Sequence, residues 1–150
     1  MAEIRTPGAA SDANAAPPRP TVLVVDDERA LAELTVAILK VEGFDARCVY
    51  SAEDALVVVR AWRPRIILLD IVLPRMNGVT AALRLARTFP DLRIILISGQ
   101  ADILELLEPA RSAGYDFPVL AKPVPPSELI RVLRASAPEP PAKEFRRPAG

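Results

Sequence analysis

The 150-residue chain contains no histidine and one cysteine, Cys48. Without histidine, neither a Ser-His-Asp nor a Cys-His catalytic arrangement is available, and the usual zinc sites are excluded. A single cysteine excludes a disulfide framework within the chain and a cysteine metal cluster. Any bound metal is therefore expected to be a hard cation held by oxygen atoms.

The chain also lacks a net charge, a long basic run and a long apolar run. A neutral chain gives no electrostatic support for nucleic-acid binding. No apolar run is long enough to span a bilayer. The first 20 residues have neither the basic start nor the apolar core of a secretory signal. We therefore expect a cytoplasmic protein that binds neither nucleic acid nor a membrane.

The two ends of the chain are poor in large apolar residues. Residues 1–20 are rich in Ala, Pro, Ser and Gly, and residues 137–150 contain four prolines. Such segments bury too little apolar surface to become ordered. We expect a disordered arm over 1–20, one folded domain over 21–136 and a disordered tail over 137–150. No further domain is expected after the tail.

Between these ends, apolar runs alternate with helical patterns. The runs predict strands over 21–25, 45–50, 65–70, 93–97 and 119–121. Helices are predicted from about residue 29 to Gly43 and over 51–60, 79–88, 102–113 and 127–135. In the first helix, Leu31, Leu34, Ile38 and Leu39 are expected to share the buried face. Pro109 predicts a kink or a split in the fourth.

The alternation of five strands with five helices indicates an α/β fold with a parallel sheet and helices on both faces. Parallel strands place their carboxyl ends along one edge of the sheet, where such folds bind ligands. Polar side chains stand at four of the five predicted strand ends. They are Asp26 with Asp27, Asp70, Ser98 and Lys122.

These side chains suggest phosphoryl chemistry. Three carboxylates at one edge repel each other unless a cation lies among them. Mg²⁺ suits a site of oxygen ligands, because it binds a few carboxylates together with water and phosphate oxygens. Lys122 and Ser98 suit the remaining oxygens of a phosphoryl group. The set therefore predicts that Asp70 is a nucleophile that accepts a phosphoryl group.

Four motifs resemble those of the receiver domain of two-component response regulators, over about residues 21–135. They are Val24-Val25-Asp26-Asp27-Glu28, Asp70-x-x-Leu73-Pro74-x-Met76-x-Gly78, Ile97-Ser98-Gly99 and Lys122-Pro123. The resemblance implies a flavodoxin-like, doubly wound (βα)5 fold with sheet order 2-1-3-4-5.

The resemblance also implies a role for each site residue. Asp70 would be the phosphoacceptor, and Ser98 and Lys122 would be the switch hydroxyl and lysine. The Mg²⁺ ligands would be Asp26, Asp27, Asp70 and the backbone carbonyl of Val72.

The chain departs from the family's pattern between Ser98 and Lys122. Val119 stands where receivers usually carry Tyr or Phe, and Phe117 is the nearest aromatic residue. The interval is slightly long, and Pro109 lies within it. These departures predict an altered conformational switch and leave the phosphorylation chemistry intact.

Three functions are compatible with these observations. The first is a stand-alone, single-domain response regulator. It would take its phosphoryl group from a histidine kinase or phosphotransfer protein and dock on a downstream protein target. It would not be an enzyme beyond Mg²⁺-dependent self-phosphorylation and autodephosphorylation. The alternative is a receiver-like interaction module that signals without phosphorylation. A phosphatase of the haloacid-dehalogenase type is disfavoured, because Val72 stands where that chemistry needs a second acid.

Overall fold

A five-stranded parallel sheet forms the centre of the computed structural model, which describes residues 18–99 and 103–136. The strand order is β2-β1-β3-β4-β5, as expected. The strands are β1 (Thr21–Val25), β2 (Asp45–Val49), β3 (Ile66–Asp70), β4 (Arg93–Ser98) and β5 (Val119–Ala121). The helices are α2 (Arg29–Val41), α3 (Ala52–Trp62), α4 (Gly78–Thr88), α5 (Ile103–Ser112) and α6 (Pro126–Ser136).

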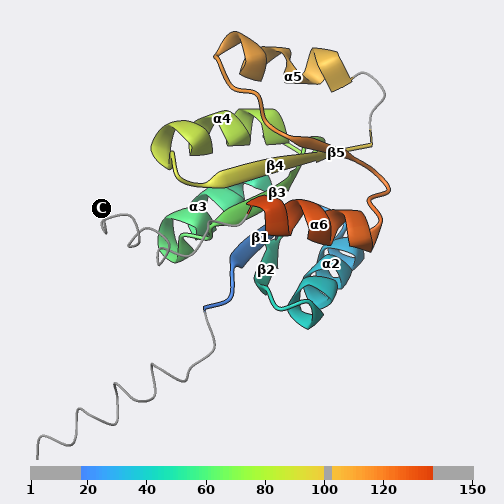
Figure 1. Cartoon of the computed structure of the whole chain (residues 1–150). Helices are drawn as coiled ribbons and strands as arrows, with labels where there is room; N and C mark the ends of the chain where they lie inside the picture. Colours follow the sequence, from blue (N-terminus) through green and yellow to red (C-terminus); the bar gives the residue numbers. More distant parts are fainter. Residues whose placement is uncertain (1–17, 100–102, 137–150) are drawn as a thin grey trace, which may run out of the picture.

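The helices cover both faces of the sheet (Figure 1). Helices α3, α4 and α5 share one buried cluster with the sheet, and α2 and α6 share the other. The parallel sheet with helices on both faces, predicted from the alternating pattern, is therefore confirmed, as is the doubly wound fold that the resemblance implied. None of the helices in the described ranges is long and apolar enough to cross a membrane.

The central strand, β3, is buried along its whole length. It pairs with β1 on one side and with β4 on the other. Ile67 and Leu69 enter the cluster under α3 and α4, whereas Ile66 and Leu68 enter the one under α2 and α6. A strand covered on both faces needs apolar residues at every position, which explains the uninterrupted run. Asp70 ends this run.

Helix α2 does not bury the face expected from the sequence. Leu31 is 38% exposed and Leu34 is 56% exposed, whereas Ala32 and Leu39 are fully buried. The expectation for Leu31 and Leu34 was wrong because α2 carries two apolar stripes at helical spacing. The sheet takes the stripe that contains the small Ala32.

A kink or a split was predicted at Pro109; helix α5 runs through the proline as one helix, so the split did not occur and the kink stays a prediction. Beyond the proline the backbone bonding resumes, with the amide of Ala113 donating to the carbonyl of Pro109 at 3.2 Å. The expected arm and tail fall almost entirely outside the described residues, as does the expected helix start at Asp102.

The loop after β3 folds tightly back onto the strand end. The amide of Gly78 donates to the carbonyl of Ile71 at 2.7 Å, and Asn77 caps α4 by accepting from the amide of Thr80 at 2.9 Å. A Cβ at position 78 would collide with the carbonyl oxygen of Asp70 and lie 2.8 Å from the Ile71 Cα. The loop can therefore approach Asp70 this closely only with glycine.

We predict that Gly78→Ala destabilises the protein, although this change ordinarily stabilises a helix by about 1 kcal/mol. The new methyl group meets backbone atoms that cannot move aside, so a loss of at least about 2 kcal/mol is expected in urea unfolding. Gly99→Ala is the matched control, because its Cβ would meet only side-chain atoms at 3.7 Å or more. Equal effects of the two substitutions would contradict this account.

Candidate functional site

Four strand ends bring the predicted site residues together at one edge of the sheet. Asp26 and Asp27 follow β1, Asp70 ends β3, Ser98 ends β4 and Lys122 follows β5. One oxygen from each of the three aspartates lies within 4.8 Å of the other two. Asp26, Asp70 and Ser98 are buried, whereas Asp27 is exposed to solvent. Among the acids of the site, two are therefore shielded from solvent and one is accessible to it.

Lys122 is the cation of this cluster. Its Nζ donates to Asp70 Oδ2 at 2.6 Å and to Asp26 Oδ2 at 3.5 Å. The other oxygens of these carboxylates accept from backbone amides. Val72 N donates to Asp70 Oδ1 at 3.2 Å, and Glu28 N donates to Asp26 Oδ1 at 2.9 Å. Both carboxylates are therefore held in fixed orientations.

Burial dominates the protonation equilibrium of Asp70. It raises the pKa of the carboxyl group above its ordinary value, and the nearby charge of Asp26 raises it further. The hydrogen bond and charge of Lys122 and the amide of Val72 act in the opposite direction without cancelling the rise. Ionised Asp70 is therefore an electrostatically expensive group in the empty site.

The same environment also shifts the pKa of Lys122, but here burial acts in the opposite direction to its effect on Asp70. Burial alone would lower the pKa of its ammonium group. The hydrogen bond to Asp70 and the charges of Asp70 and Asp26 outweigh burial, so the pKa is raised. Lys122 thus stays charged, and the lysine with the three aspartates leaves a formal charge of −2 when all are ionised.

The donor set fits a divalent cation. Three carboxylates converge, and none of the described residues offers an imidazole. Oxygen-only ligation with excess negative charge suits Mg²⁺. Asp26, Asp27 and Asp70 would hold the ion. The contribution predicted for the Val72 backbone carbonyl stays a prediction.

Ser98 is buried between its neighbours at the end of β4. Its carbonyl accepts from the amide of Lys122 at 2.9 Å, which joins the two strand ends. Val119 pairs with Leu96 at the start of β5. Phe117 stacks on Tyr115 with ring centroids 5.5 Å apart, before β5 begins. The strand β5 itself, Val119–Ala121, therefore contains no aromatic residue.

A cavity of about 500 Å³ adjoins the acidic cluster. Asp26, Asp70 and Lys122 form its polar end, and its apolar wall includes Leu31 of α2 and Leu129 of α6. Sequence reasoning missed this wall because it assigned Leu31 to the core. The second apolar stripe of α2 was the sequence feature from which this wall could have been predicted.

The fold and these strand-end residues together define a receiver-type signalling domain. Residues 22–134 match the response regulator receiver domain, and the chain belongs to this family.

Curated relatives with similar sequences include two longer regulators. The DNA-binding response regulator MtrA of Mycobacterium tuberculosis (strain ATCC 25618 / H37Rv) is 35% identical over 117 residues, covering 78% of this chain and 50% of MtrA. The nitrogen assimilation regulatory protein NtrX of Azorhizobium caulinodans is 33% identical over 111 residues, covering 73% of this chain and 24% of NtrX. The chain thus spans half or less of the length of these relatives.

Solved structures resemble the chain over nearly their whole length. A CheY-like receiver domain protein from Methanospirillum hungatei JF-1 has a TM-score of 0.73 at 28% identity, covering 79% of this chain and 93% of that one. The receiver domain of NtrX from Brucella abortus has a TM-score of 0.68 at 32% identity, covering 77% and 96%.

We predict that Lys122→Met destabilises the metal-free protein by about 2 kcal/mol near neutral pH, because it leaves Asp26 and Asp70 as an uncompensated pair. The raised pKa of Lys122 means that its ammonium group is charged at every pH below the ordinary lysine value. This charge is lost only as the pH rises through the folded-state pKa, so below that range the size of the effect follows the ionisation of the neighbouring aspartates.

The loss in free energy of unfolding caused by Lys122→Met is expected to depend on pH. Because the folded-state pKa of Asp70 is raised, the cost of ionising it appears as the pH rises from the ordinary aspartate value through the raised one. The deficit of Lys122→Met should therefore be smaller at about pH 5 than at about pH 7.5 in urea unfolding. Lys40→Met, which removes an exposed lysine of α2, is the control. A pH-independent deficit would contradict the assignment.

Proposed function

We propose that this chain accepts a phosphoryl group on Asp70 from a histidine kinase or a histidine phosphotransfer protein and then signals by docking on a protein target. The observation that carries the proposal is the buried Asp70 carboxylate, bound by Lys122 Nζ at 2.6 Å beside Asp26 and Asp27. Membership of the receiver family supports the same chemistry.

In the proposed transfer, a carboxylate oxygen of Asp70 attacks the phosphorus of a phosphohistidine. A new O–P bond forms, the N–P bond breaks, and its electron pair stays on the imidazole, which takes up a proton from solvent. The Val72 amide orients one oxygen of Asp70. Lys122 neutralises negative charge on the incoming phosphoryl group. Bound Mg²⁺ would stabilise the charge that develops on the phosphoryl oxygens.

The surface beside Asp70 supports a protein as the phosphodonor. Leu31 and Leu34 are exposed on α2, and Val72 is 49% exposed in the loop after Asp70. The cavity that reaches Asp70 opens between α2 and the segment that leads into α6. Exposed apolar residues next to a reacting group are typical of a protein docking site. We propose that the donor contacts this surface.

The proposal covers phosphoacceptor chemistry and docking, and it includes no metabolic reaction. The matched residues cover only half of the relative described as DNA-binding. We propose no nucleic-acid contact for the described residues, in keeping with the neutral charge of the chain.

A second candidate is a receiver-like module that docks without being phosphorylated. It is favoured by Val119, which lacks the ring of the family's switch, and by Pro109 in α5. Both candidates use the same fold, so the chemical state of Asp70 separates them.

Treatment with acetyl phosphate and Mg²⁺ is predicted to add the mass of one phosphoryl group to the intact chain. Asp70→Asn should abolish the addition, and removal of Mg²⁺ by EDTA should suppress it strongly. Asp45→Asn, which alters an exposed acid at the start of β2, should label like the unmodified chain. An unlabelled chain, or equal labelling of Asp70→Asn, would favour the second candidate.

Because β5 carries no switch ring, phosphorylation is predicted to displace α5 more than β5. Beryllofluoride with Mg²⁺ mimics the acyl phosphate and permits an amide-shift measurement. The amides of residues 103–108 should shift more than those of 119–122. Shifts confined to 119–122 would contradict the prediction, which also extends to residues 100–102 outside the described ranges.

A further inference from the structure

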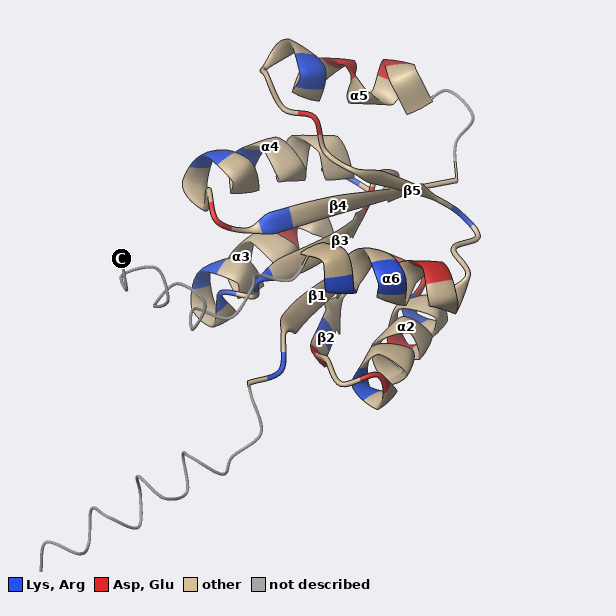
Figure 2. Cartoon of the chain, in the orientation of Figure 1, with Lys and Arg blue, Asp and Glu red and all other residues tan. Residues whose placement is uncertain are grey.

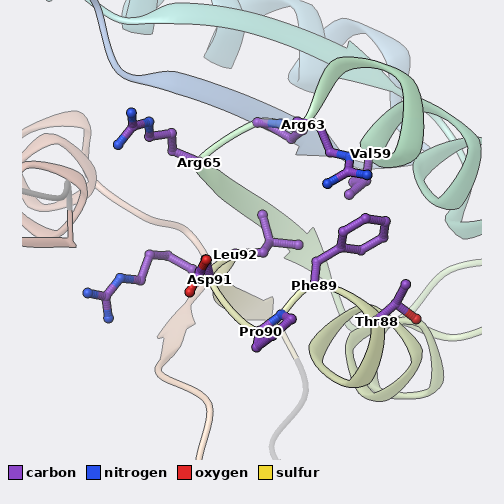
Figure 3. A pocket seen from close by; sticks show the side chains of 10 residues that line it. Val59, Arg63, Arg65, Thr88, Phe89, Pro90, Asp91 and Leu92 are labelled. Atoms are coloured by element: carbon purple, nitrogen blue, oxygen red, sulfur yellow. The ribbon is translucent and has the colours of Figure 1, made fainter.

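A second cavity, of about 570 Å³, lies at the opposite edge of the sheet from Asp70 (Figure 3). It is lined by residues 63–65 between α3 and β3, by residues 88–93 between α4 and β4, and by Val59 of α3. Its volume falls within the range of small-molecule sites. The proposed phosphoacceptor chemistry does not involve this edge, where β3 and β4 begin.

Positive charge is concentrated around this cavity. Its lining contains Arg63, Arg65 and Arg93 with one acid, Asp91, which gives a formal charge of +2 on a chain whose net charge is zero. Over most of the molecule, basic and acidic residues are interspersed (Figure 2). Ion pairs among residues 18–99 and 103–136 involve only Arg75, Lys122 and Arg134 as cations. The three arginines of the cavity have no such partner there, so they attract an anion.

Arg63 is held in place at the rim. It adopts a left-handed backbone conformation at the end of α3, with φ 57° and ψ 59°. Its Nε donates to the carbonyl of Arg60 at 3.2 Å, and its guanidinium carbon lies 4.8 Å from the centre of the Phe89 ring. Within the described part of the chain, its terminal nitrogens make no hydrogen bond. They are available to a ligand.

Arg65 and Arg93 stand on adjacent, anchored backbone segments. The amide of Arg93 donates to the carbonyl of Arg65 at 3.0 Å, and the amide of Arg65 donates to Thr21 Oγ1 at 2.9 Å. Both side chains are exposed. Figure 3 shows Arg63 and Arg65 leaving their turn in opposite directions, so cations flank the cavity on two sides. The planar guanidinium fork matches the oxygens of a phosphate group.

Apart from the charged residues and Thr88, the lining of the cavity is apolar. Val59 and Pro64 are buried, and Phe89 and Leu92 are half-buried. Arg63 already covers the Phe89 ring, so the cavity does not require an aromatic ligand that stacks there. The apolar residues of the lining instead favour a ligand whose anionic group is attached to a small, non-aromatic carbon skeleton.

We propose that this cavity binds a small organic phosphate. The guanidinium groups of Arg65 and Arg93, whose backbones are hydrogen-bonded to each other, hold the phosphate, and Arg63 adds positive charge on the other side. The carbon skeleton lies against Phe89 and Leu92. This second site is separate from the phosphoacceptor, and its failure would leave the proposal for Asp70 unaffected.

Amide chemical shifts test the proposal on the full chain in the presence of EDTA. The probes are glucose 6-phosphate, adenosine monophosphate, inorganic phosphate and glucose. At least one organic phosphate should shift the amides of residues 63–65 and 88–93 in a saturable manner. Glucose should not, and inorganic phosphate should bind more weakly.

The double variant Arg65→Gln/Arg93→Gln should weaken binding of that organic phosphate by at least about tenfold. The matched control is Arg84→Gln/Arg111→Gln, which removes two exposed arginines outside the cavity and should leave affinity unchanged. Arg65→Lys keeps the positive charge but loses the planar guanidinium group. Its affinity for the organic phosphate should lie between that of the unmodified chain and that of the double variant.

Three results would overturn the proposal. The first is the absence of shifts at these amides with every phosphate. The second is an equal loss of affinity in the control double variant, which would indicate diffuse surface charge. The third is inorganic phosphate binding as tightly as the organic phosphates, which would indicate an adventitious ion only.

Discussion

The contact between Lys122 Nζ and Asp70 Oδ2 is the interaction on which the proposed chemistry depends. The two residues are 52 positions apart in the chain, and they meet only because β3 and β5 end at the same edge of one sheet. The contact opposes the rise that burial causes in the pKa of Asp70 and so favours its ionised form. The packed core thus supplies the site with both a precise separation and a low dielectric.

Burial also distinguishes Asp70 from an ordinary surface carboxylate. A carboxylate in water is solvated from all sides, whereas Asp70 has one oxygen on Lys122 and the other on the Val72 amide. One of its oxygens also lies within 4.8 Å of an oxygen of Asp26 and of the exposed Asp27. Repulsion among the acids makes the empty site electrostatically unfavourable, and a cation with a phosphoryl group relieves this repulsion. This electrostatic imbalance is consistent with the proposed binding of Mg²⁺ and acceptance of a phosphoryl group.

Much of the fold was predictable because buried parallel strands leave an unambiguous signal. The apolar run that ends at Asp70 is typical of a central strand buried on both faces. Because parallel strands end at one edge of the sheet, the residues that lie near Asp70 could also be predicted. The buried face of α2 was not predictable, because Leu31 and Ala32 belong to two competing stripes. The separations within the cluster depend on strand register, which sequence periodicity does not specify. The arginine-lined cavity arises from two turns, where no periodic pattern exists.

The two edges of the sheet, where the strands end and where they begin, differ in how far their residues can be substituted. At the carboxyl edge, Asp70 and Lys122 must meet at hydrogen-bond distance, and the loop that ends at Gly78 packs against the strand end. At the amino edge, the turns carry exposed side chains on anchored backbones, as at Arg65 and Arg93. Side chains there can change without disturbing the core.

The short edge strand β5 bears on how this molecule associates with others. It has three residues, and prolines at positions 118 and 123 flank it closely. An edge strand normally presents a row of amides and carbonyls that invites another chain to extend the sheet. Here the row is brief and is flanked by residues without an amide hydrogen. Strand addition at β5 is thereby discouraged, which agrees with the proposal that partners contact side-chain surfaces such as the exposed stripe of α2.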